Sequence, residues 1–220
     1  PFCGVGCLLT YNVKDNKIVS VEGRDGPANH QRLCVKGRFG FDYIQHPQRL
    51  TVPLIRKAGM AKDPALIGAL NRHAADWSAV FREATWEEAL ALGAGKLKQL
   101  RDTHGPKSLA GFGSAKGSNE EAYLFQKLVR TGFGSNNVDH CTRLCHASSV
   151  VALLEGIGSG AVSNPVMDVS KAEVIVIIGA NPTVNHPVAA TWIKNAVKNG
   201  SKLLVLDPRR SDLTRLAHRH

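Results

Sequence analysis

The sequence predicts an α/β protein, with a small β-rich N-terminal subdomain followed by domains built on parallel sheets. Residues 8–22 place two β-prone runs around a polar turn, as a hairpin does. Residues 85–134 hold helices with capping signals separated by a short apolar run. Residues 171–211 read as strand, loop, helix, strand and loop, which is the βαβ unit of a parallel sheet.

The segments between the hairpin and the first long helix have weaker signals. Residues 39–44 favour a short helical turn, and residues 49–56 an extended segment in which Pro53 marks an edge or a connection. Residues 57–85 lack periodicity and are interpreted as a variable surface insertion with some helix. No internal repeat or low-complexity tract is present.

Two capped helices are predicted next. Residues 85–105 are amphipathic, with Thr85 as the N-cap, Glu88 completing a capping box, and a glycine after the last turn. Residues 108–113 favour a short strand, and residues 118–134 a second capped helix that ends at glycine.

The last third begins with an apolar-periodic stretch and continues into the βαβ unit. Residues 141–155 predict one helix. The continuous apolar run at 172–180 predicts a buried strand, and a second strand precedes Asp207.

Composition limits the classes of function. The 220 residues are 43% hydrophobic and carry a net charge of +10, which favours an anionic partner. Aromatic residues make up only 6% and no Lys/Arg block interleaves with them, so no nucleic-acid partner is expected. No apolar run approaches the roughly 18 residues that a membrane span needs. Five cysteines in two groups indicate metal or catalytic work in a reducing compartment.

The N-terminal cysteines form a candidate metal site. Cys3 and Cys7 are spaced C-x3-C, and Cys34 follows in LCVKG. Thiolates suit zinc, copper(I) or iron–sulfur clusters. A cysteine directly before Pro1 would complete C-x2-C-x3-C with a distant fourth ligand, a pattern suited to one [4Fe-4S] cluster. Glycines interleave the first two cysteines, as a tight loop requires. Zinc, or simple burial of small side chains, remains an alternative.

The stretch HCTRLCH at 140–146 is the second candidate. On a helix Cys141 and Cys145 are i,i+4 neighbours, and with His140 or His146 they offer a zinc set. The same stretch follows a glycine-ended helix and leads into a helix N-terminus, which stabilises an anionic thiolate. A histidine beside that thiolate suits proton transfer.

Two loops follow the strands of the βαβ unit. Ligands bind beyond the carboxyl ends of strands in open α/β sheets, although Asn, Pro and Asp are also ordinary turn residues. A Gly/Ser-rich turn at 111–121 has the same character and is not a Walker motif. The candidate cofactor-binding residues are Gly179, Asn181, Asn185 with His186, Asp207, Arg209 and, more weakly, Ser114 and Lys116.

Five motifs occur in one order: PFCGVGC, LCVKGRFGFDYI, NNVDHCTRLCH, GANPTVNHP and LDPRRS. Together they resemble the molybdopterin oxidoreductases of the dimethyl-sulfoxide-reductase superfamily. More closely, they resemble the catalytic alpha subunit of molybdenum- or tungsten-dependent formate dehydrogenases, with the soluble NAD-linked type the best match. The resemblance covers nearly the whole chain, and residues 57–85 are the least distinctive.

The resemblance implies an N-terminal portion of such a subunit, cut at both ends. It implies a [4Fe-4S] subdomain at 1–50, a pterin-cofactor domain at 51–137 and a Rossmann-like domain at 138–220. Three cluster ligands would be Cys3, Cys7 and Cys34, with the other before Pro1. Lys36 would lie between cluster and pterin and aid electron passage.

At the second candidate site, the resemblance makes Cys145 the molybdenum ligand and His146 the adjacent active-site histidine. Cys141 matches no ligand and is interpreted as a packed or idle thiol. Arg143 and His140 would support the helix start or the pterin.

The implied reaction is reversible oxidation of formate to carbon dioxide at a bis(molybdopterin guanine dinucleotide) centre. Electrons would pass through the cluster to partner subunits with further clusters and flavin, and then to NAD in the cytoplasm. Assimilatory nitrate reductase is the alternative, but it carries CM where this chain has CH. A zinc-stabilised binding module and an electron-transfer domain like that of respiratory complex I are further alternatives. The fragment alone is predicted to be inactive.

Overall fold

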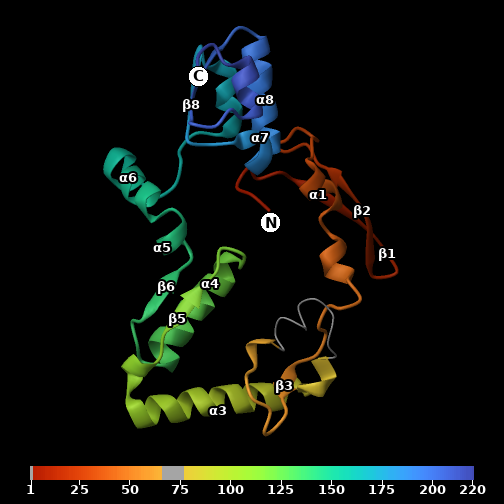
Figure 1. Cartoon of the computed structure of the whole chain (residues 1–220), viewed down its shortest axis with the longest axis vertical. Helices are drawn as coiled ribbons and strands as arrows, with labels where there is room; N and C mark the ends of the chain where they lie inside the picture. The colour runs from red at the N-terminus through yellow and green to blue at the C-terminus, as the bar shows by residue number, and fades with distance from the viewer. Residues whose placement is uncertain (1, 66–76) are drawn as a thin grey trace. The chain divides into compact units, whose positions relative to one another are not determined.

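The computed structural model describes residues 2–65 and 77–220. Part of the predicted insertion, 66–76, therefore lies outside the described residues. The chain divides into two compact units (Figure 1). The first unit is residues 1–49 with 161–220, and the second unit is residues 50–160. The threefold domain division expected above stays a prediction.

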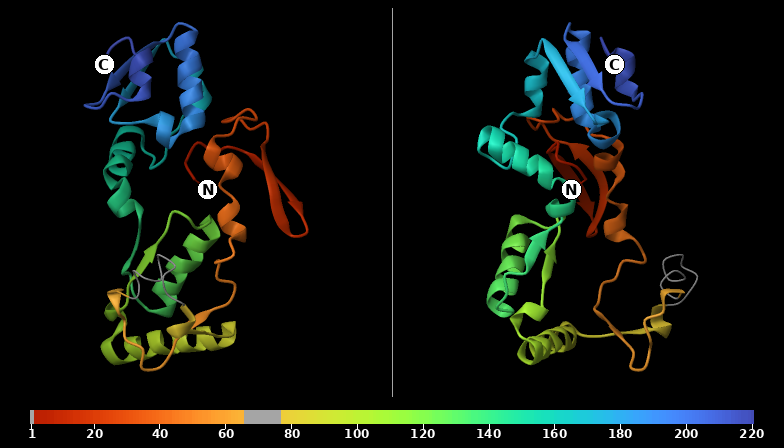
Figure 2. Two further views of the ribbon diagram at one scale, coloured as in Figure 1. Left: turned by 45° about the vertical axis from the view of Figure 1, so that its right-hand side comes forward. Right: turned by 60° about the vertical axis from the view of Figure 1, so that its left-hand side comes forward.

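The first unit opens with the predicted hairpin. Strand β1 (Leu9–Lys14) pairs antiparallel with β2 (Lys17–Gly23). The two turn residues, Asp15 and Asn16, have φ of 49° and 58°, the left-handed pair that a tight hairpin turn requires. Helix α1 (Val35–Phe39) lies beside the hairpin (Figure 2). The helical turn predicted over residues 39–44 is found slightly later, as η1 (Asp42–Gln45).

A buried asparagine holds the loops of this subdomain together. Asn29 is 0% exposed. Its Oδ1 accepts from the backbone N–H of Leu8 at 3.0 Å, and its Nδ2 donates to the carbonyls of Leu8, Arg24 and Arg32 at 3.1–3.2 Å. A buried amide with its partners satisfied is rigid. Asn29 therefore ties the chain after Cys7 to the chain before Cys34.

The predicted βαβ unit is confirmed. Strand β7 (Val174–Ile178) pairs in parallel with β8 (Lys202–Leu206), and between them run α7 (Pro182–Asn185) and α8 (Pro187–Lys198). Short helical turns η5 (Val166–Lys171) and η6 (Asp212–Leu216) flank it. The core of buried side chains comprises Ile175, Ile177, Ile193, Ala196, Leu203, Val205 and Leu213.

The prediction that the first strand is buried is wrong for every second residue. Val174, Val176 and Ile178 are exposed, Ile178 by 68%, and Leu206 of β8 is exposed beside them. Side chains alternate between the two faces of a strand. Within the described residues of the first unit, helices pack against only the face that carries Ile175 and Leu203.

Trp192 on α8 joins the hairpin subdomain to the βαβ unit. Its Nε1 donates to the carbonyl of Ala28 at 2.8 Å. The Arg32 guanidinium lies 5.2 Å from its ring centre, and the His30 ring packs edge-on at 5.3 Å. A cation above an indole and a neighbouring ring both add attraction to the buried area. The two parts of the first unit thus share one packed joint.

The second unit begins with a two-stranded sheet that the sequence did not predict. Strand β3 (Leu54–Arg56) pairs antiparallel with β4 (Phe81–Glu83), with the helical turn η2 (Trp77–Ala79) just before β4. Helix α3 (Trp86–His104) follows, and its N-cap Thr85 accepts from the backbone N–H of Glu88. The predicted capping box is half wrong, because the Glu88 carboxylate pairs with Arg82 instead.

The second unit also contains a βαβ unit. After the turn η3 (Pro106–Ser108), strand β5 (Gly111–Gly113) pairs in parallel with β6 (Val138–His140). Between them α4 (Asn119–Lys127) starts with a full Ser118–Glu121 capping box and ends in a π-helical turn, η4 (Leu128–Gly132). At Gly111 a Cβ would fall 2.5 Å from Val129, so only glycine lets α4 and its extension pack this close.

The single helix predicted over 141–155 is wrong. The chain forms α5 (Thr142–Cys145) and α6 (Ala147–Ile157), separated at His146 with φ −145° and ψ 34°. The break falls between the two residues singled out for chemistry, Cys145 and His146. Cys145 therefore ends one helical turn and directly precedes the N-cap of the next helix.

Candidate functional site

The three N-terminal cysteines lie near one another in the first unit. Cys3 is exposed, whereas Cys7 and Cys34 are half-buried. Burial, and then the proximity of Cys3 and Cys34, raise the pKa of the Cys7 thiol. Of the two interleaved glycines, Gly6 has φ +81° and so needs to be glycine, whereas Gly4 is not in the left-handed region.

Within residues 2–65 and 77–220, no three His, Cys, Asp or Glu side chains gather as closely as a single metal ion requires. A cubane cluster spaces its cysteine sulfurs more widely than one ion does. Three soft thiols on a loop with one left-handed glycine are donors that suit a [4Fe-4S] cluster, and zinc accepts the same donors.

Lys36 reaches from the cysteine subdomain to the βαβ unit. It lies on α1 directly after Cys34 and Val35, and its Nζ donates to the carbonyl of Val184 on α7 at 3.5 Å. This contact places the ammonium between the cysteine loop and the loop after β7. The position supports the bridging role expected for Lys36.

The two predicted cofactor loops meet at one edge of the β7–β8 sheet. Ile178 is the register partner of Leu206, and the N–H of Gly179 donates to the Leu206 carbonyl at 2.9 Å. Gly179 has φ +58°, and a Cβ there would meet no atom within 4 Å. The strand ends therefore open onto free space where a heterocycle or sugar can approach the backbone.

Side chains at this edge are held by local hydrogen bonds. Asn181 Oδ1 accepts from Thr183 Oγ1 at 2.6 Å, and Asp207 Oδ1 accepts from the backbone N–H of Arg209 at 2.8 Å. Asn185 ends α7, and His186 is the N-cap residue of α8, as predicted. The edge thus presents amide, carboxylate and guanidinium groups suited to a nucleotide.

A cavity of about 420 Å³ lies beside the cysteine loop. Gly4 and Val5 line it together with His186 and Ala189, and Val162, Asn164, Pro165 and Val166 also contribute. All these residues belong to the first unit. The sequence did not predict that His186 faces the loop that carries Cys3 and Cys7.

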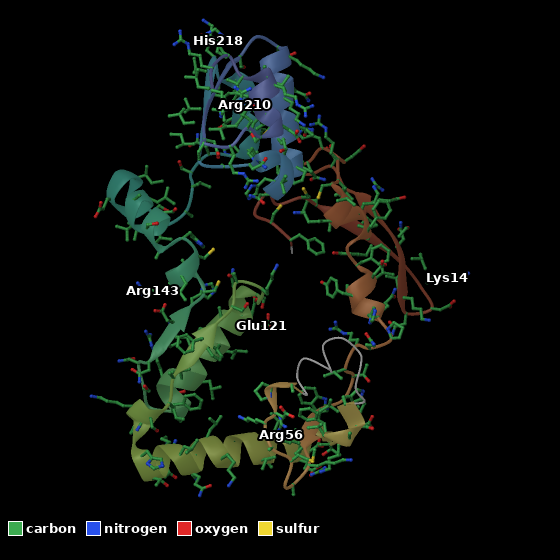
Figure 3. The ribbon with its side chains drawn as sticks, in the orientation of Figure 1. Lys14, Arg56, Glu121, Arg143, Arg210 and His218 are labelled. Atoms are coloured by element: carbon green, nitrogen blue, oxygen red, sulfur yellow. The ribbon has the colours of Figure 1, made fainter. Side chains whose placement is uncertain are left out.

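A larger cavity, about 670 Å³, lies in the second unit at the carboxyl ends of β5 and β6. Ser114 and Lys116 line it, as do Asp139 and His140. Phe112 and Phe125 supply apolar walls, and Glu121 on α4 (Figure 3) also lines the cavity. Sequence reasoning gave Asp139, Glu121 and the two phenylalanines no role, because their approach depends on the pairing of β5 with β6 and on the packing of α4 against β5.

The HCTRLCH stretch begins at His140, which lines this cavity, and continues into α5. Its two cysteines are exposed and one helical turn apart, with the Cys145 N–H donating to the Cys141 carbonyl at 3.1 Å. His140 Nδ1 lies 2.8 Å from Thr142 Oγ1 and 3.8 Å from Cys141 Sγ. His140 thus supports the start of α5, as predicted. Cys141 is exposed rather than packed, which corrects that part of the prediction.

Arg143 also supports this helical turn (Figure 3). Its Nε donates to Asp139 Oδ2 at 2.8 Å, and Asp139 Oδ1 accepts from the His140 N–H at 2.8 Å. The Arg143 side chain, and next this backbone N–H, hold the pKa of Asp139 below its usual range. The carboxylate therefore clamps the end of β6 to the start of α5.

This clamp makes a prediction about pH. Because its pKa is lowered in the folded state, the ionised Asp139 carboxylate stabilises the fold at pH values above its unfolded-state pKa. This contribution is lost as the pH falls through the folded-state pKa. Arg143→Gln should raise the pKa of Asp139 toward its ordinary value, measured by carbon-13 NMR of the carboxyl group. The control is Arg130→Gln on the π-helical turn. An unchanged Asp139 titration in Arg143→Gln would contradict the clamp.

The family models and two similar relatives of this chain point to the same family of proteins. Residues 49–220 match the model of the molybdopterin oxidoreductase family, and residues 1–46 match the molybdopterin oxidoreductase Fe4S4 domain. The chain is 40% identical over its whole length to the F420-dependent formate dehydrogenase 2 subunit alpha of Methanococcus maripaludis. It is 34% identical, also over its whole length, to formate dehydrogenase H of Escherichia coli. It spans 29% of each of these two proteins.

A solved structure shares the fold at low sequence identity. Acetylene hydratase from Pelobacter acetylenicus superimposes with a TM-score of 0.68 and 19% identity, covering 99% of this chain and 28% of that protein. At this identity the likeness concerns the fold alone. It confirms the α/β class expected from the sequence. No helix within the described residues is both long and apolar enough to cross a membrane.

Proposed function

The chain belongs to the molybdopterin oxidoreductase family, and we propose that it forms part of the catalytic subunit of a formate dehydrogenase. Its two matched domains carry a molybdenum–pterin cofactor and a [4Fe-4S] cluster. The observation that carries the proposal is the pair Cys145–His146 at the break between α5 and α6. An exposed thiol at this break, followed by histidine, suits a metal ligand with a proton carrier beside it.

Each predicted residue then has a role in holding or serving the cofactors. Cys145 would ligate the metal, and Cys3, Cys7 and Cys34 would hold the cluster. The open edge beyond β7 and β8, and the cavity lined by Ser114, would hold the pterin guanine dinucleotides. The residues proposed at these pterin sites are Gly179, Asn181, Asn185, Asp207, Arg209 and Ser114. Lys36 would bridge pterin and cluster.

When bound, the molybdenum or tungsten centre supplies the two-electron chemistry, and the protein supplies position and electrostatics. His146 would take up or steer the proton that formate oxidation releases. The basic balance of the chain, +10, suits the cofactor phosphates and the formate anion. Electrons would leave through the cluster to partner subunits with flavin and further clusters, and then to NAD. We propose a cytoplasmic enzyme, as expected from the resemblance.

The proposal is tested with the full-length protein, purified without oxygen from a host that makes the pterin. The protein is expected to reduce benzyl viologen with electrons from formate. With reduced viologen as the electron donor, it is expected not to reduce nitrate. Consumption of nitrate without formate oxidation, in protein shown to hold metal and iron, would overturn the assignment in favour of nitrate reduction. Supplying NAD or F420 in place of the dye then identifies the acceptor, since one relative is named for F420.

A further inference from the structure

Two cysteines, Cys141 and Cys145, lie one helical turn apart. The proposed function assigns a role to Cys145 alone. Cys141 begins the turn and Cys145 ends it, joined by a 3.1 Å hydrogen bond between their backbones. Both side chains are exposed. The second thiol, Cys141, has no ligand role in the site described above.

The spacing of these cysteines approaches what a disulfide needs. One helical turn separates Cα atoms i and i+4 by about 6.2 Å. Disulfides span Cα distances of roughly 4.4–6.8 Å, so the backbone is already in range. The Cβ atoms of such neighbours are about 5–6 Å apart and must approach by about 1–2 Å before the sulfurs can bond.

The local structure lets the turn tighten. Helix α5 is a single turn, with β6 before it and the His146 break after it. Leu144, between the two cysteines, is 96% exposed, so no core packing resists movement of this end. The start of the turn is fixed by Asp139 and Arg143, which leaves the Cys145 end as the part that moves.

We propose that Cys141 is a resolving thiol, which forms a reversible disulfide with Cys145 when Cys145 carries no metal. Hydrogen peroxide oxidises the Cys145 thiol to a sulfenic acid, and the peroxide is reduced with release of water. The Cys141 thiol attacks this sulfur, the S–S bond forms, and the thiol proton leaves with the sulfenic hydroxyl as a second water. The balance is two thiols and one peroxide giving one disulfide and two waters.

The disulfide would protect the proposed metal ligand before cofactor insertion. A lone exposed sulfenic acid proceeds to sulfinic acid, which ordinary thiols do not reverse. A disulfide is reversed by thiol exchange, which returns Cys145 in the form that binds metal. The inference extends the proposed function by assigning Cys141, but the thiol chemistry itself does not depend on which substrate the enzyme uses.

Trypsin makes the test direct, because cleavage after Arg143 separates the two cysteines. Full-length protein is made in a host that lacks the pterin, treated with hydrogen peroxide, alkylated and digested. Peptides 131–143 and 144–171 are expected as one cross-linked pair by mass spectrometry, which dithiothreitol separates. In Cys141→Ser the pair should be lost, and peptide 144–171 should carry sulfinic acid instead.

Ser149→Ala serves as the control, because it changes a side chain on α6, outside this turn, and should leave the cross-linked pair intact. The proposal is overturned if wild-type protein gives alkylated Cys141 together with over-oxidised Cys145. It is equally overturned if Cys145 is joined to any other cysteine. The experiment uses no formate, so failure of the formate assay and failure of this inference are distinguishable.

Discussion

Replacing Cys145 by alanine is expected to abolish formate-dependent dye reduction by the full-length protein. Cys145 ends α5 directly before the N-cap His146, and its thiol is exposed at this break. Loss of partners that merely orient a metal ligand costs roughly 10–100-fold in affinity or activity, so loss of a ligand itself should exceed about 100-fold. The rate of viologen reduction, measured at equal protein-bound iron, checks this prediction.

The matched control for that variant lies one turn away. Cys141→Ser changes a thiol on the same helical turn and should retain formate activity under reducing, oxygen-free conditions. Iron content should be equal in both variants, because the cluster cysteines lie elsewhere in the sequence. Formate activity that survives in Cys145→Ala, or that fails equally in Cys141→Ser, would refute the ligand role of Cys145.

Lys36→Met is expected to separate reduction of the metal centre from reduction of the cluster. The Lys36 ammonium contacts the Val184 carbonyl at 3.5 Å and so joins the cysteine subdomain to the cofactor loop. Methionine keeps an unbranched chain but removes the charge and the hydrogen bond. Formate-driven appearance of the reduced-cluster electron paramagnetic resonance signal should slow by roughly tenfold or more, as for other groups that surround a metal centre without binding it.

Lys14→Met is the control for this second variant, because Lys14 lies at the end of the hairpin (Figure 3). It removes the same charge from the same subdomain without touching α7. The KM for formate should be unchanged in both variants, since neither residue is placed at the metal. Reduction of the cluster at the wild-type rate in Lys36→Met would show that the lysine does not serve electron passage.

The parts of the fold that the sequence predicted are those set by local signals. The hairpin follows from its left-handed turn at Asp15 and Asn16, and the capped helices from Thr85 and Ser118. The break at His146 was missed because apolar periodicity continues across it. The exposed side chains of β7 were missed because a continuous apolar run does not reveal how many faces of a strand are covered.

The candidate site also has parts that the sequence predicted and parts that it did not. The loops after β7 and β8 were predictable, since parallel strands end at a common edge. The approach of Asp139 to Ser114 was not, because it arises only when β6 pairs with β5. The contact between Lys36 and Val184 could not be predicted from the sequence spacing of these residues. It depends on the packing of Trp192 against the loop that contains Ala28. The roles given to Cys145 and His146 came from resemblance, and they stay predictions.

The uncovered face of the β7–β8 sheet has a practical consequence for anyone who prepares this chain by itself. Val174, Val176, Ile178 and Leu206 form a strip of branched aliphatic side chains in contact with water. Burying one such side chain is worth about 1.5–3 kcal/mol, and a strip of neighbours multiplies that gain for any molecule that covers it. Concentrated solutions of the isolated chain will therefore tend toward self-association and precipitation, so biochemical work is best done at low concentration or on the full-length protein.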